Sequence, residues 1–317
     1  MKNKIKYESY KCGFSDAAIL KLKINSKKFE NRYIKFKDQK SYLNALAIKI
    51  SNNKKYFIFD PQLIGNSKKE IVINKYDIKK FNLEDCKSYL ADIGQLNNIY
   101  ESTKELEKIL KNLKLLKGGK KIVDFGCGFG SAIQYLSSKH QSTKFIGCDK
   151  NKKILAIAKT FGDYENLKYQ YQNFFNFKKE KLFRNVSCLF NIHTLCCFKD
   201  AEIFIECTTK MRPKYIIIKS LFYDGPLNTF IHTEDLGQAD KKNIDGDLNI
   251  FSKQMIIDIY KKFNYKFLTY KPFFMKKKLL RVKNSGRRSY TIYYNNKLNT
   301  FTGPVYLPWG FMIFKKK

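Results

Sequence analysis

The chain has 317 residues, 44% of them hydrophobic, which is enough for one large domain or for a catalytic domain with an appended module. Its 62 lysine and arginine residues against 28 acidic residues give a net charge of +34, which leaves an acidic small molecule, an acidic surface, a nucleic acid or plain compositional drift as explanations. The sequence holds no apolar run of about 18 residues and no CxxC pair, which excludes an ordinary transmembrane helix and a common zinc site and favours a cytoplasmic protein.

Residues 1–95 are predicted to form a small α+β accessory module. The stretches 55–59 and 70–73 are rich in apolar residues typical of strands, and turn residues separate them. No residue pattern here carries recognisable chemistry, so substrate recognition, cofactor cover and subunit contact all stay open for this module. A catalytic domain is expected to cover residues 96–317.

Helical and strand-like stretches alternate from residue 100 onward. The first is a helix, predicted for 100–116 from apolar residues at helical spacing and ended by Gly118-Gly119. The strands and helices expected after it cover, in chain order, 122–125, 131–139, 145–149, 152–160, 167–171, 186–192, 200–211 and 215–218. This alternation predicts an α/β fold with a doubly wound, mostly parallel sheet, which binds ligands at the carboxyl ends of its strands, beside the point where the strand order reverses.

A long loop is predicted after the fifth strand, over residues 222–251, where it can close over a substrate. Ser252 is expected to cap a helix that runs to about residue 263. A β-rich tail, residues 275–317, follows this helix.

A glycine-rich turn follows the first predicted strand of the catalytic domain and opens a helix. It reads Gly126-x-Gly128-x-Gly130, and glycine suits a tight turn whose bare backbone a ligand must approach. Amides at the start of the following helix point at such a ligand. Asp149 ends the next strand, where a carboxylate can accept hydrogen bonds from both hydroxyls of a ribose.

Three interpretations of this turn compete. A dinucleotide site prefers glycine or alanine at the sixth position, where Ser131 stands, and Asp124 beside the turn would repel a pyrophosphate. A chance glycine-rich turn does not explain why the strand, the helix and the acid fall in place together. The carboxylate of Asp124 suits a ligand that carries an ammonium and a sulfonium group, which is the interpretation the residues favour.

At this point residues 124–130 and 145–149 resemble the first and second motifs of class I methyltransferases that depend on S-adenosylmethionine, within a similarity that spans roughly residues 100–274. The resemblance implies a seven-stranded sheet, with Asp124 and the glycines holding the methionine moiety and Asp149 holding the ribose. It extends the expected cofactor contacts to Phe125, Cys127, Lys150, Asn173, Phe174 and Asn191. Family members often have an acid near the adenine, and Asn173 stands in that region here.

Two histidines are candidates for a general base. Methyl transfer is an in-line displacement, and a hydroxyl acceptor must also lose its proton. His193, at the end of the fourth strand, is the best candidate, with packing against the cofactor or a strand-end role as the alternative. His232, in the predicted loop, is the second candidate.

The tail supplies candidate substrate contacts. Arg287 and Arg288 can form bidentate contacts with a phosphate or carboxylate, and Trp309 lies in a proline-rich aromatic segment that suits a rigid wall. The alternative is that the tail finishes the sheet as its antiparallel edge. The segments 285–291 and 303–309 resemble the ends of bacterial methyltransferases from surface-polysaccharide loci.

Together these patterns predict a cytoplasmic methyltransferase that moves a methyl group from S-adenosylmethionine to an oxygen of a polar small molecule or glycan precursor, phosphorylated ones included. No metal site and no membrane span are predicted. The segment after strand four lacks the Asn/Asp-Pro-Pro-Tyr signature of enzymes that methylate nucleobase amines. An RNA methyltransferase that uses the basic surface and a non-catalytic protein that binds S-adenosylmethionine and a partner are the alternatives. The sequence leaves the acceptor and the oligomeric state open.

Overall fold

A computed structural model describes most of the chain beyond residue 98 and four strands before it. The described ranges are 6–11, 18–23, 45–51, 55–58, 99–161, 164–173, 181–235, 244–281 and 289–317. The chain packs as two compact units. One contains Met1–Tyr100, Gly128–Tyr135 and Asn151–Asp163, and the other contains Glu101–Cys127, Leu136–Lys150 and Tyr164–Lys317.

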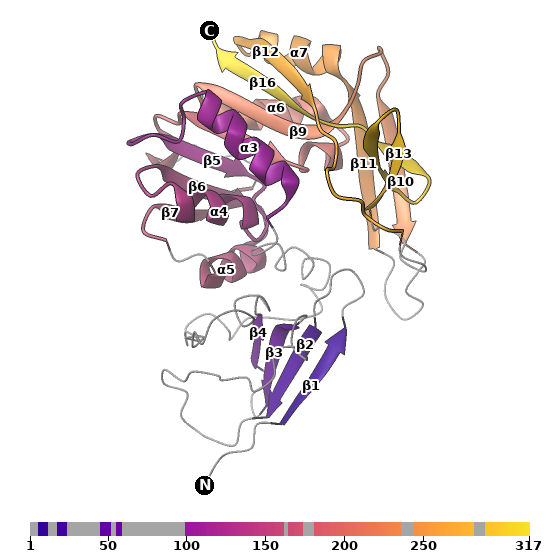
Figure 1. Ribbon diagram of the computed structural model, residues 1–317. Coiled ribbons are helices and arrows are strands. Elements are labelled where there is room, and N and C mark those ends of the chain that lie inside the picture. Colours follow the sequence, from indigo (N-terminus) through magenta and orange to yellow (C-terminus); the bar gives the residue numbers. More distant parts are fainter. Residues whose placement is uncertain are drawn as a thin grey trace. The chain divides into compact units, whose positions relative to one another are not determined.

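The N-terminal region contains a four-stranded sheet (Figure 1). Its strands are β1 (Lys6–Lys11), β2 (Ala18–Lys23), β3 (Ala45–Ser51) and β4 (Lys55–Ile58), in that order across the sheet. Strands β2 and β3 are parallel, and the other two pairs are antiparallel. The strand predicted for 55–59 is confirmed as β4, whereas the one predicted for 70–73 lies outside the described residues. The domain boundary after residue 95 stays a prediction.

Five parallel strands form the centre of the larger sheet (Figure 1). They are β5 (Lys121–Phe125), β6 (Lys144–Asp149), β7 (Leu167–Tyr171), β8 (Cys188–Ile192) and β9 (Tyr215–Tyr223). Their order is β7-β6-β5-β8-β9, so the chain adds strands on one side of β5 and then returns to add them on the other. The order therefore reverses between β5 and β8, where a doubly wound sheet opens a ligand crevice.

Two strands from the C-terminal part of the chain extend this sheet beyond β9. Strand β16 (Trp309–Lys316) is antiparallel to β9, and β12 (Tyr265–Pro272) is antiparallel to β16. These seven strands confirm the prediction of a doubly wound, mostly parallel sheet. The end of the tail does not form the edge of the sheet, because β16 lies between β9 and β12.

The loop predicted for 222–251 is wrong over most of its length, because two strands occupy it. Strand β10 (Thr229–Asp235) pairs antiparallel with β11 (Ile244–Ser252), and the last three residues of β11 pair parallel with the end of β9. The two strands raise the number in the sheet to nine. Polar and acidic residues resembled a solvated loop, but cross-strand pairing satisfies their backbone groups and leaves alternate side chains in water.

The described helices follow the expected alternation closely. They are α3 (Glu101–Asn112), α4 (Ser131–Lys139), α5 (Lys152–Phe161), α6 (Ala201–Lys210) and α7 (Lys253–Lys262), with short 3-10 turns η5 (Lys181–Phe183) and η6 (Leu195–Cys197). Asp200 caps α6 by accepting from the amides of Glu202 and Ile203, and Ser252 caps α7 as predicted.

Helix α3 ends earlier than predicted, at Asn112. Lys114 takes the left-handed conformation at φ 56°, and the amide of Leu115 donates to the carbonyl oxygen of Leu110 at 2.9 Å. This is the hydrogen-bond pattern that closes a helix at a left-handed residue. A lysine therefore ends the helix, in place of Gly118-Gly119.

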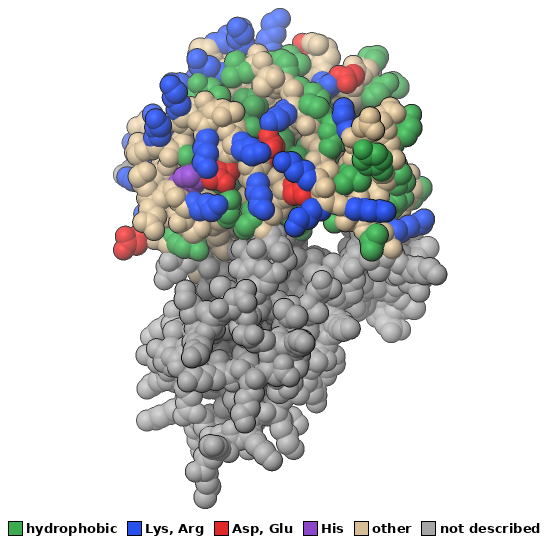
Figure 2. Space-filling view, viewed as in Figure 1, with side chains coloured by type: hydrophobic (Ala, Val, Ile, Leu, Met, Phe, Trp, Pro, Cys, Tyr) green, Lys and Arg blue, Asp and Glu red, His purple; other side chains and the backbone are tan. Residues whose placement is uncertain are grey.

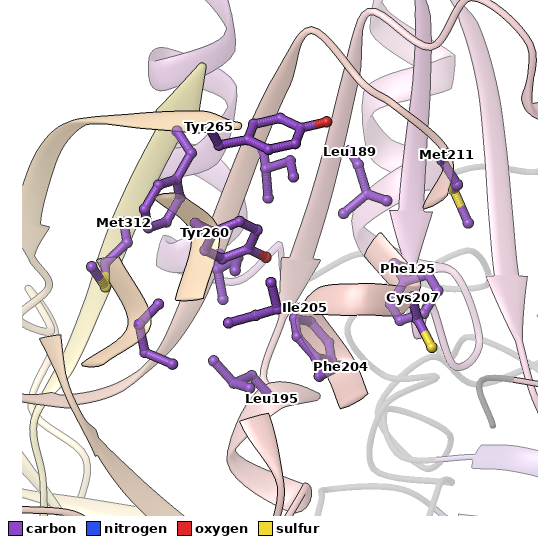
Figure 3. Packing of buried hydrophobic residues seen from close by; sticks show 14 of the residues in the cluster. Phe125, Leu189, Leu195, Phe204, Ile205, Cys207, Met211, Tyr260, Tyr265 and Met312 are labelled. Atoms are coloured by element: carbon purple, nitrogen blue, oxygen red, sulfur yellow. The ribbon is translucent and has the colours of Figure 1, made fainter. Parts of the chain in front are cut away.

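The hydrophobic core of the larger unit lies where α6 and α7 pack on the sheet (Figure 3). Phe204 of α6 meets Phe125 of β5 edge to face, with 5.6 Å between ring centroids. Tyr260 of α7 is fully buried, and its hydroxyl lies 3.0 Å from Oγ1 of Thr208. Such burial fixes the strand ends that carry the polar residues described below.

The tail contains a small antiparallel sheet besides β16. Its strands are β13 (Ser289–Tyr294), β14 (Lys297–Thr302) and β15 (Val305–Leu307). The predicted β-rich tail is thereby confirmed over its described part. Among the described residues, no helix has both the length and the apolar character needed to cross a membrane.

Candidate functional site

The glycine-rich turn lies between β5 and α4, as the sequence predicts. Gly126, Gly128 and Gly130 all have positive φ, at 80°, 53° and 73°. A Cβ atom on Gly126 would lie 2.3 Å from Oγ1 of Thr194, so this position needs glycine for both its conformation and its space. The amides of Gly126 and Cys127 donate to the carbonyl oxygen of Cys148, which closes the turn and engages these two donors inside the protein.

Asn191 joins the two strands that flank the point of reversal. Its Nδ2 donates to the carbonyl oxygen of Phe125 in a short hydrogen bond, and its Oδ1 accepts from the amides of Thr194 and Leu195, each at 3.3 Å. The side chain is 1% exposed. Its predicted cofactor contact stays a prediction, and the structure adds a role in holding the end of β8 against the end of β5.

Replacing Asn191 by alanine is expected to lower the free energy of unfolding by about 1–3 kcal/mol, because it leaves a buried carbonyl oxygen and two amides without their partner. Urea denaturation followed by circular dichroism measures this change. Asn299→Ala is the matched control, since the half-buried Asn299 side chain also donates to two carbonyl oxygens, in hydrogen bonds that are exposed to solvent, and it should change stability by less than about 0.5 kcal/mol. Equal effects of the two substitutions would contradict the assigned role of Asn191.

Asp124 is a buried carboxylate near the end of β5, directly before this turn. It is 3% exposed, and among the described residues no donor or cation contacts its side-chain oxygens. Burial raises the pKa of the Asp124 carboxyl well above its usual range, and the nearby charge of Asp149 raises it further. A buried anion without a partner is costly, so this position favours a ligand that brings a positive charge.

Three further predicted cofactor residues are described near this edge of the sheet. Asp149 ends β6 and is half-buried, and Lys150 beside it is exposed. Asn173 follows β7 and is half-buried. Phe174 lies outside the described residues. The contacts of these side chains with a cofactor stay predictions.

Cys127 lies within the turn, among acidic neighbours. Burial raises the pKa of the Cys127 thiol well above its usual range, and the charges of Asp124 and Asp149 raise it further. The group is therefore a neutral thiol rather than a thiolate nucleophile. No disulfide joins the cysteines in the part of the chain that the structure describes.

The ends of β8 and β9 bring His193 and Lys219 together. The strand register pairs Ile192 with Lys219, and the amide of His193 donates to the carbonyl oxygen of Lys219 at 3.0 Å. In addition, Nε2 of His193 and Nζ of Lys219 form a short hydrogen bond. His193 has a φ of 70°, a left-handed conformation that is uncommon for a residue with a Cβ atom.

Aromatic rings surround this histidine and lysine. The ring centroid of Trp309, the first residue of β16, lies 4.4 Å from that of His193 and 3.9 Å from Nζ of Lys219. Phe273, which follows β12, has its centroid 5.1 Å from the same nitrogen. Trp309 thus lies beside the candidate base, while its predicted contact with substrate stays a prediction.

The protonation of both groups is shifted by their surroundings. Lys219 is 1% exposed, and burial lowers its pKa well below the usual range of a lysine. Burial also lowers the pKa of His193, and the charge of Lys219 lowers it further. Both groups are therefore driven toward their neutral forms, in which a nitrogen lone pair can accept a proton.

Lys219 is a residue of this site that was not predicted from the sequence. The expected fifth strand ends at residue 218, whereas β9 continues to Tyr223. One signal is present in the sequence: Lys219 stands between Ile218 and the apolar pair Leu221-Phe222, inside a run that is otherwise strand-like. In a chain with 62 lysine and arginine residues, one more lysine at a strand end resembles an ordinary solvated residue.

Among the other predicted catalytic residues, His232 does not contact this group. His232 lies on β10, where its Nδ1 is 3.0 Å from the carboxylate of Asp247, its partner across the strands, and its side chain is 64% exposed. Its predicted catalytic role stays a prediction, now from a strand rather than a loop. Arg287 and Arg288 lie outside the described residues. Within the described ranges, no cluster of three or more metal-binding side chains is found.

Comparisons with known proteins find structural likeness only. No family model matches the sequence, and no curated protein matches it. The magnesium protoporphyrin IX methyltransferase from Synechocystis PCC 6803, solved with bound SAH, matches at a TM-score of 0.44 and 12% identity, over 75% of this chain and 89% of that one.

Two more solved structures show the range of proteins matched. An S-adenosylmethionine-dependent methyltransferase from Mesorhizobium loti gives a TM-score of 0.40 and 14% identity, over 52% of this chain and 83% of that one. The [4+2]-cyclase SpnF gives 0.41 and 10%, over 53% and 58%. TM-scores below 0.5 do not indicate a shared activity, so the proposed function is based on the geometry of the site.

Proposed function

We propose that this protein is an enzyme that binds S-adenosylmethionine at the edge of the sheet formed by the ends of β5, β6 and β8, and that it methylates an oxygen atom of a polar small molecule or glycan precursor. When bound, S-adenosylmethionine supplies an electrophilic methyl group, and its sulfur keeps the electron pair of the broken bond. The protein's own residues bind the cofactor and remove the acceptor's proton.

The observation that carries the cofactor proposal is the buried carboxylate of Asp124, which has no partner among the described residues. It lies where the strand order reverses, next to a turn whose first glycine has no room for a side chain. An ammonium group placed there supplies the missing positive charge, whereas a pyrophosphate would add a second anion. The residues therefore fit the methionine moiety of S-adenosylmethionine better than a dinucleotide.

Asp149 is the proposed ribose contact, since it ends the strand next to β5. A carboxylate at this position can accept hydrogen bonds from two neighbouring hydroxyls. The spatial closeness of the two acids supports one shared site, because the charge of Asp149 contributes to the raised pKa of Asp124.

His193 is the proposed base for the acceptor hydroxyl. It follows β8, the strand beside β5, and is half-buried. Its depressed pKa keeps the imidazole neutral at neutral pH, which is the form that accepts a proton. The adjoining ring of Trp309 offers a flat apolar surface for the body of the acceptor.

The described face that Figure 2 shows gives no reason to prefer a nucleic acid as the acceptor. Figure 2 shows lysine and arginine side chains spread over the visible described face, with acidic and hydrophobic side chains between them. Nucleic-acid sites more often gather positive charge along one stripe or groove. The resemblance to proteins of surface-polysaccharide loci gains no support from the comparisons, and the proposed acceptor class does not depend on it.

The proposed activity is tested by incubating the purified protein with methyl-labelled S-adenosylmethionine and fractionated extract of the native cell. Label in low-molecular-weight polar compounds or glycans supports the proposal. Label in RNA that disappears with ribonuclease would favour the RNA methyltransferase instead. Absence of label from every fraction, together with retained binding of S-adenosylhomocysteine, would favour the non-catalytic protein.

The affinity for S-adenosylhomocysteine is expected to rise with pH over the acidic range. Without ligand, the pKa of Asp124 lies well above 3.8, and a ligand ammonium binds the ionised carboxylate. The complex therefore holds fewer protons at this group than the free protein, and linkage makes binding stronger as pH rises through that pKa. Isothermal titration calorimetry in two buffers of different ionisation enthalpy measures the affinity and the released proton. An affinity that falls as pH rises across this range would contradict the proposed contact.

A further inference from the structure

The hydrogen bond between Lys219 and His193 constrains where protons can lie. Two nitrogens in direct contact share one proton, so either Lys219 donates as an ammonium to Nε2, or Nε2–H donates to a neutral amine. Among the described residues, no other hydrogen bond to the His193 ring is found. The second ring nitrogen, Nδ1, is therefore the one left for a hydrogen bond with an acceptor hydroxyl.

We propose that Lys219 is the final proton acceptor of this site and that His193 passes the acceptor's proton to it. The inference rests on the proposed methyl transfer. The acceptor oxygen forms the new bond to carbon, and its proton passes to Nδ1 of His193. At the same time the Nε2 proton passes to Nζ of Lys219. The imidazole ends neutral in its other tautomer, and the lysine ends as an ammonium ion, so no further reactant is required.

The aromatic rings favour this end state. Nζ of Lys219 lies 3.9 Å from the centroid of Trp309 and 5.1 Å from that of Phe273. Ring faces stabilise a desolvated cation, tryptophan most strongly. A free amine gains much less from the same rings. They therefore lower the energy of the ammonium that forms after transfer, without fixing the lysine in that state beforehand.

In the described part of the chain, no buried anion holds the lysine protonated in the resting site. Among the described residues, the charged or titratable neighbours of Lys219 are His193 and Cys196. The hydrogen bond with Cys197 and then burial raise the pKa of the Cys196 thiol well above its usual range, so it carries no charge at neutral pH. Burial lowers the pKa of Lys219, and the amine is free to accept.

This arrangement explains why His193 alone is a poor base. A histidine whose pKa is depressed by burial holds a proton weakly. Passing that proton to the lysine removes the need for a buried imidazolium. The relay also disfavours acceptors with a positive charge near the reacting oxygen, because such a charge would repel the new ammonium.

The direct test is a titration of the full-length protein labelled with 13C at lysine Cε, followed by NMR with and without S-adenosylhomocysteine. The Lys219 resonance is assigned by its absence from Lys219→Arg. We expect it to titrate well below the ordinary lysine value of about 10.4. A Lys219 side chain that stays protonated up to that pH would overturn the inference, whether or not the ligand binds.

Substitutions test the relay separately from folding. Lys219→Arg keeps a cation that cannot lose its proton. The rate of label transfer from S-adenosylmethionine into the extract fraction that the wild type labels should fall by about 100-fold or more. The rate of this variant should also no longer rise with pH. Lys253→Arg is the matched control, because Nζ of Lys253 lies 3.8 Å from the ring centroid of Tyr270 but has a carboxylate partner in Asp224. It should leave the rate unchanged.

A failed proton relay and a failed cofactor site would give different results. If S-adenosylhomocysteine binds and Lys219→Arg keeps the wild-type pH profile, Lys219 is only structural and the relay is overturned while the cofactor site stands. If no binding of S-adenosylhomocysteine is measured by calorimetry, the proposed function itself fails, and the relay for methyl transfer fails with it. Thermal unfolding of each variant shows that it is folded under the assay conditions.

Discussion

Asp124→Asn is expected to weaken the binding of S-adenosylhomocysteine by about 100-fold or more. Removing one partner of a buried charge pair costs about 2–5 kcal/mol, and 1.4 kcal/mol corresponds to a factor of ten in affinity. Asparagine keeps the size of the side chain and removes only the charge. Calorimetric titration of wild type and variant measures the difference.

The same substitution should stabilise the protein without ligand. A carboxyl whose pKa is raised in the folded state opposes folding above its unfolded pKa, and the penalty is complete above the folded pKa. Asparagine removes this penalty, so we expect the free energy of unfolding at neutral pH to rise by about 1–3 kcal/mol. Asp258→Asn is the control: Asp258 is exposed and accepts from Gln254, and its replacement should change neither quantity. A less stable Asp124→Asn protein would show that the carboxylate serves the fold.

Gly126→Ala is expected to have the largest effect on stability and to abolish ligand binding. The alanine would occupy φ 80°, which costs about 1–2 kcal/mol for a residue with a Cβ atom. Its Cβ would also lie 2.3 Å from Oγ1, 2.9 Å from Cγ2 and 3.0 Å from Cβ of Thr194. Thr194 must then move, and its amide, bonded to Asn191, moves with it.

Gly119→Ala separates these two causes. Gly119 has nearly the same conformation, at φ 76°, but no atom lies within 4 Å of its Cβ position. It should lose only the 1–2 kcal/mol of backbone strain, whereas Gly126→Ala should lose clearly more in urea denaturation. The double variant Gly126→Ala, Thr194→Ala removes two of the three close atoms and should recover part of the loss. Equal losses at Gly119 and Gly126 would mean that the approach of Thr194 is unimportant.

The local elements around the turn could be predicted from the sequence because short-range rules determine them. Strand β5, the three glycines and the start of α4 at Ser131 lie where the pattern places them. Ser252 caps its helix as the sequence predicts, because a cap depends on residues within one turn. The parallel order of the sheet follows from the alternation of strands and helices.

Long-range pairing could not be predicted in the same way. Strand β16 lies between β9 and β12, although the chain enters it after a separate three-stranded sheet. Strand β11 extends the sheet beside the end of β9, where acidic residues resembled a loop. In both cases the deciding interaction is with residues far away in the sequence, and the local pattern is compatible with an edge or a loop.

The candidate site shows the same difference between residues that local patterns identify and residues that long-range pairing brings together. Asp124 and His193 are identifiable because each stands beside a recognisable strand end. Lys219 acquires its importance only from the register that places it against His193 and from Trp309, which is 90 residues further along the chain. Its burial is a property of the assembled sheet, which composition and spacing do not contain.

Calorimetric titration of the purified wild-type protein with S-adenosylhomocysteine, and in parallel with NAD, tests whether Asp124 and the turn after it form a site for S-adenosylmethionine. We expect one bound S-adenosylhomocysteine per chain, with an affinity that rises with pH over the acidic range, and no comparable heat with NAD. No binding of S-adenosylhomocysteine, or preferential binding of NAD, would contradict this expectation.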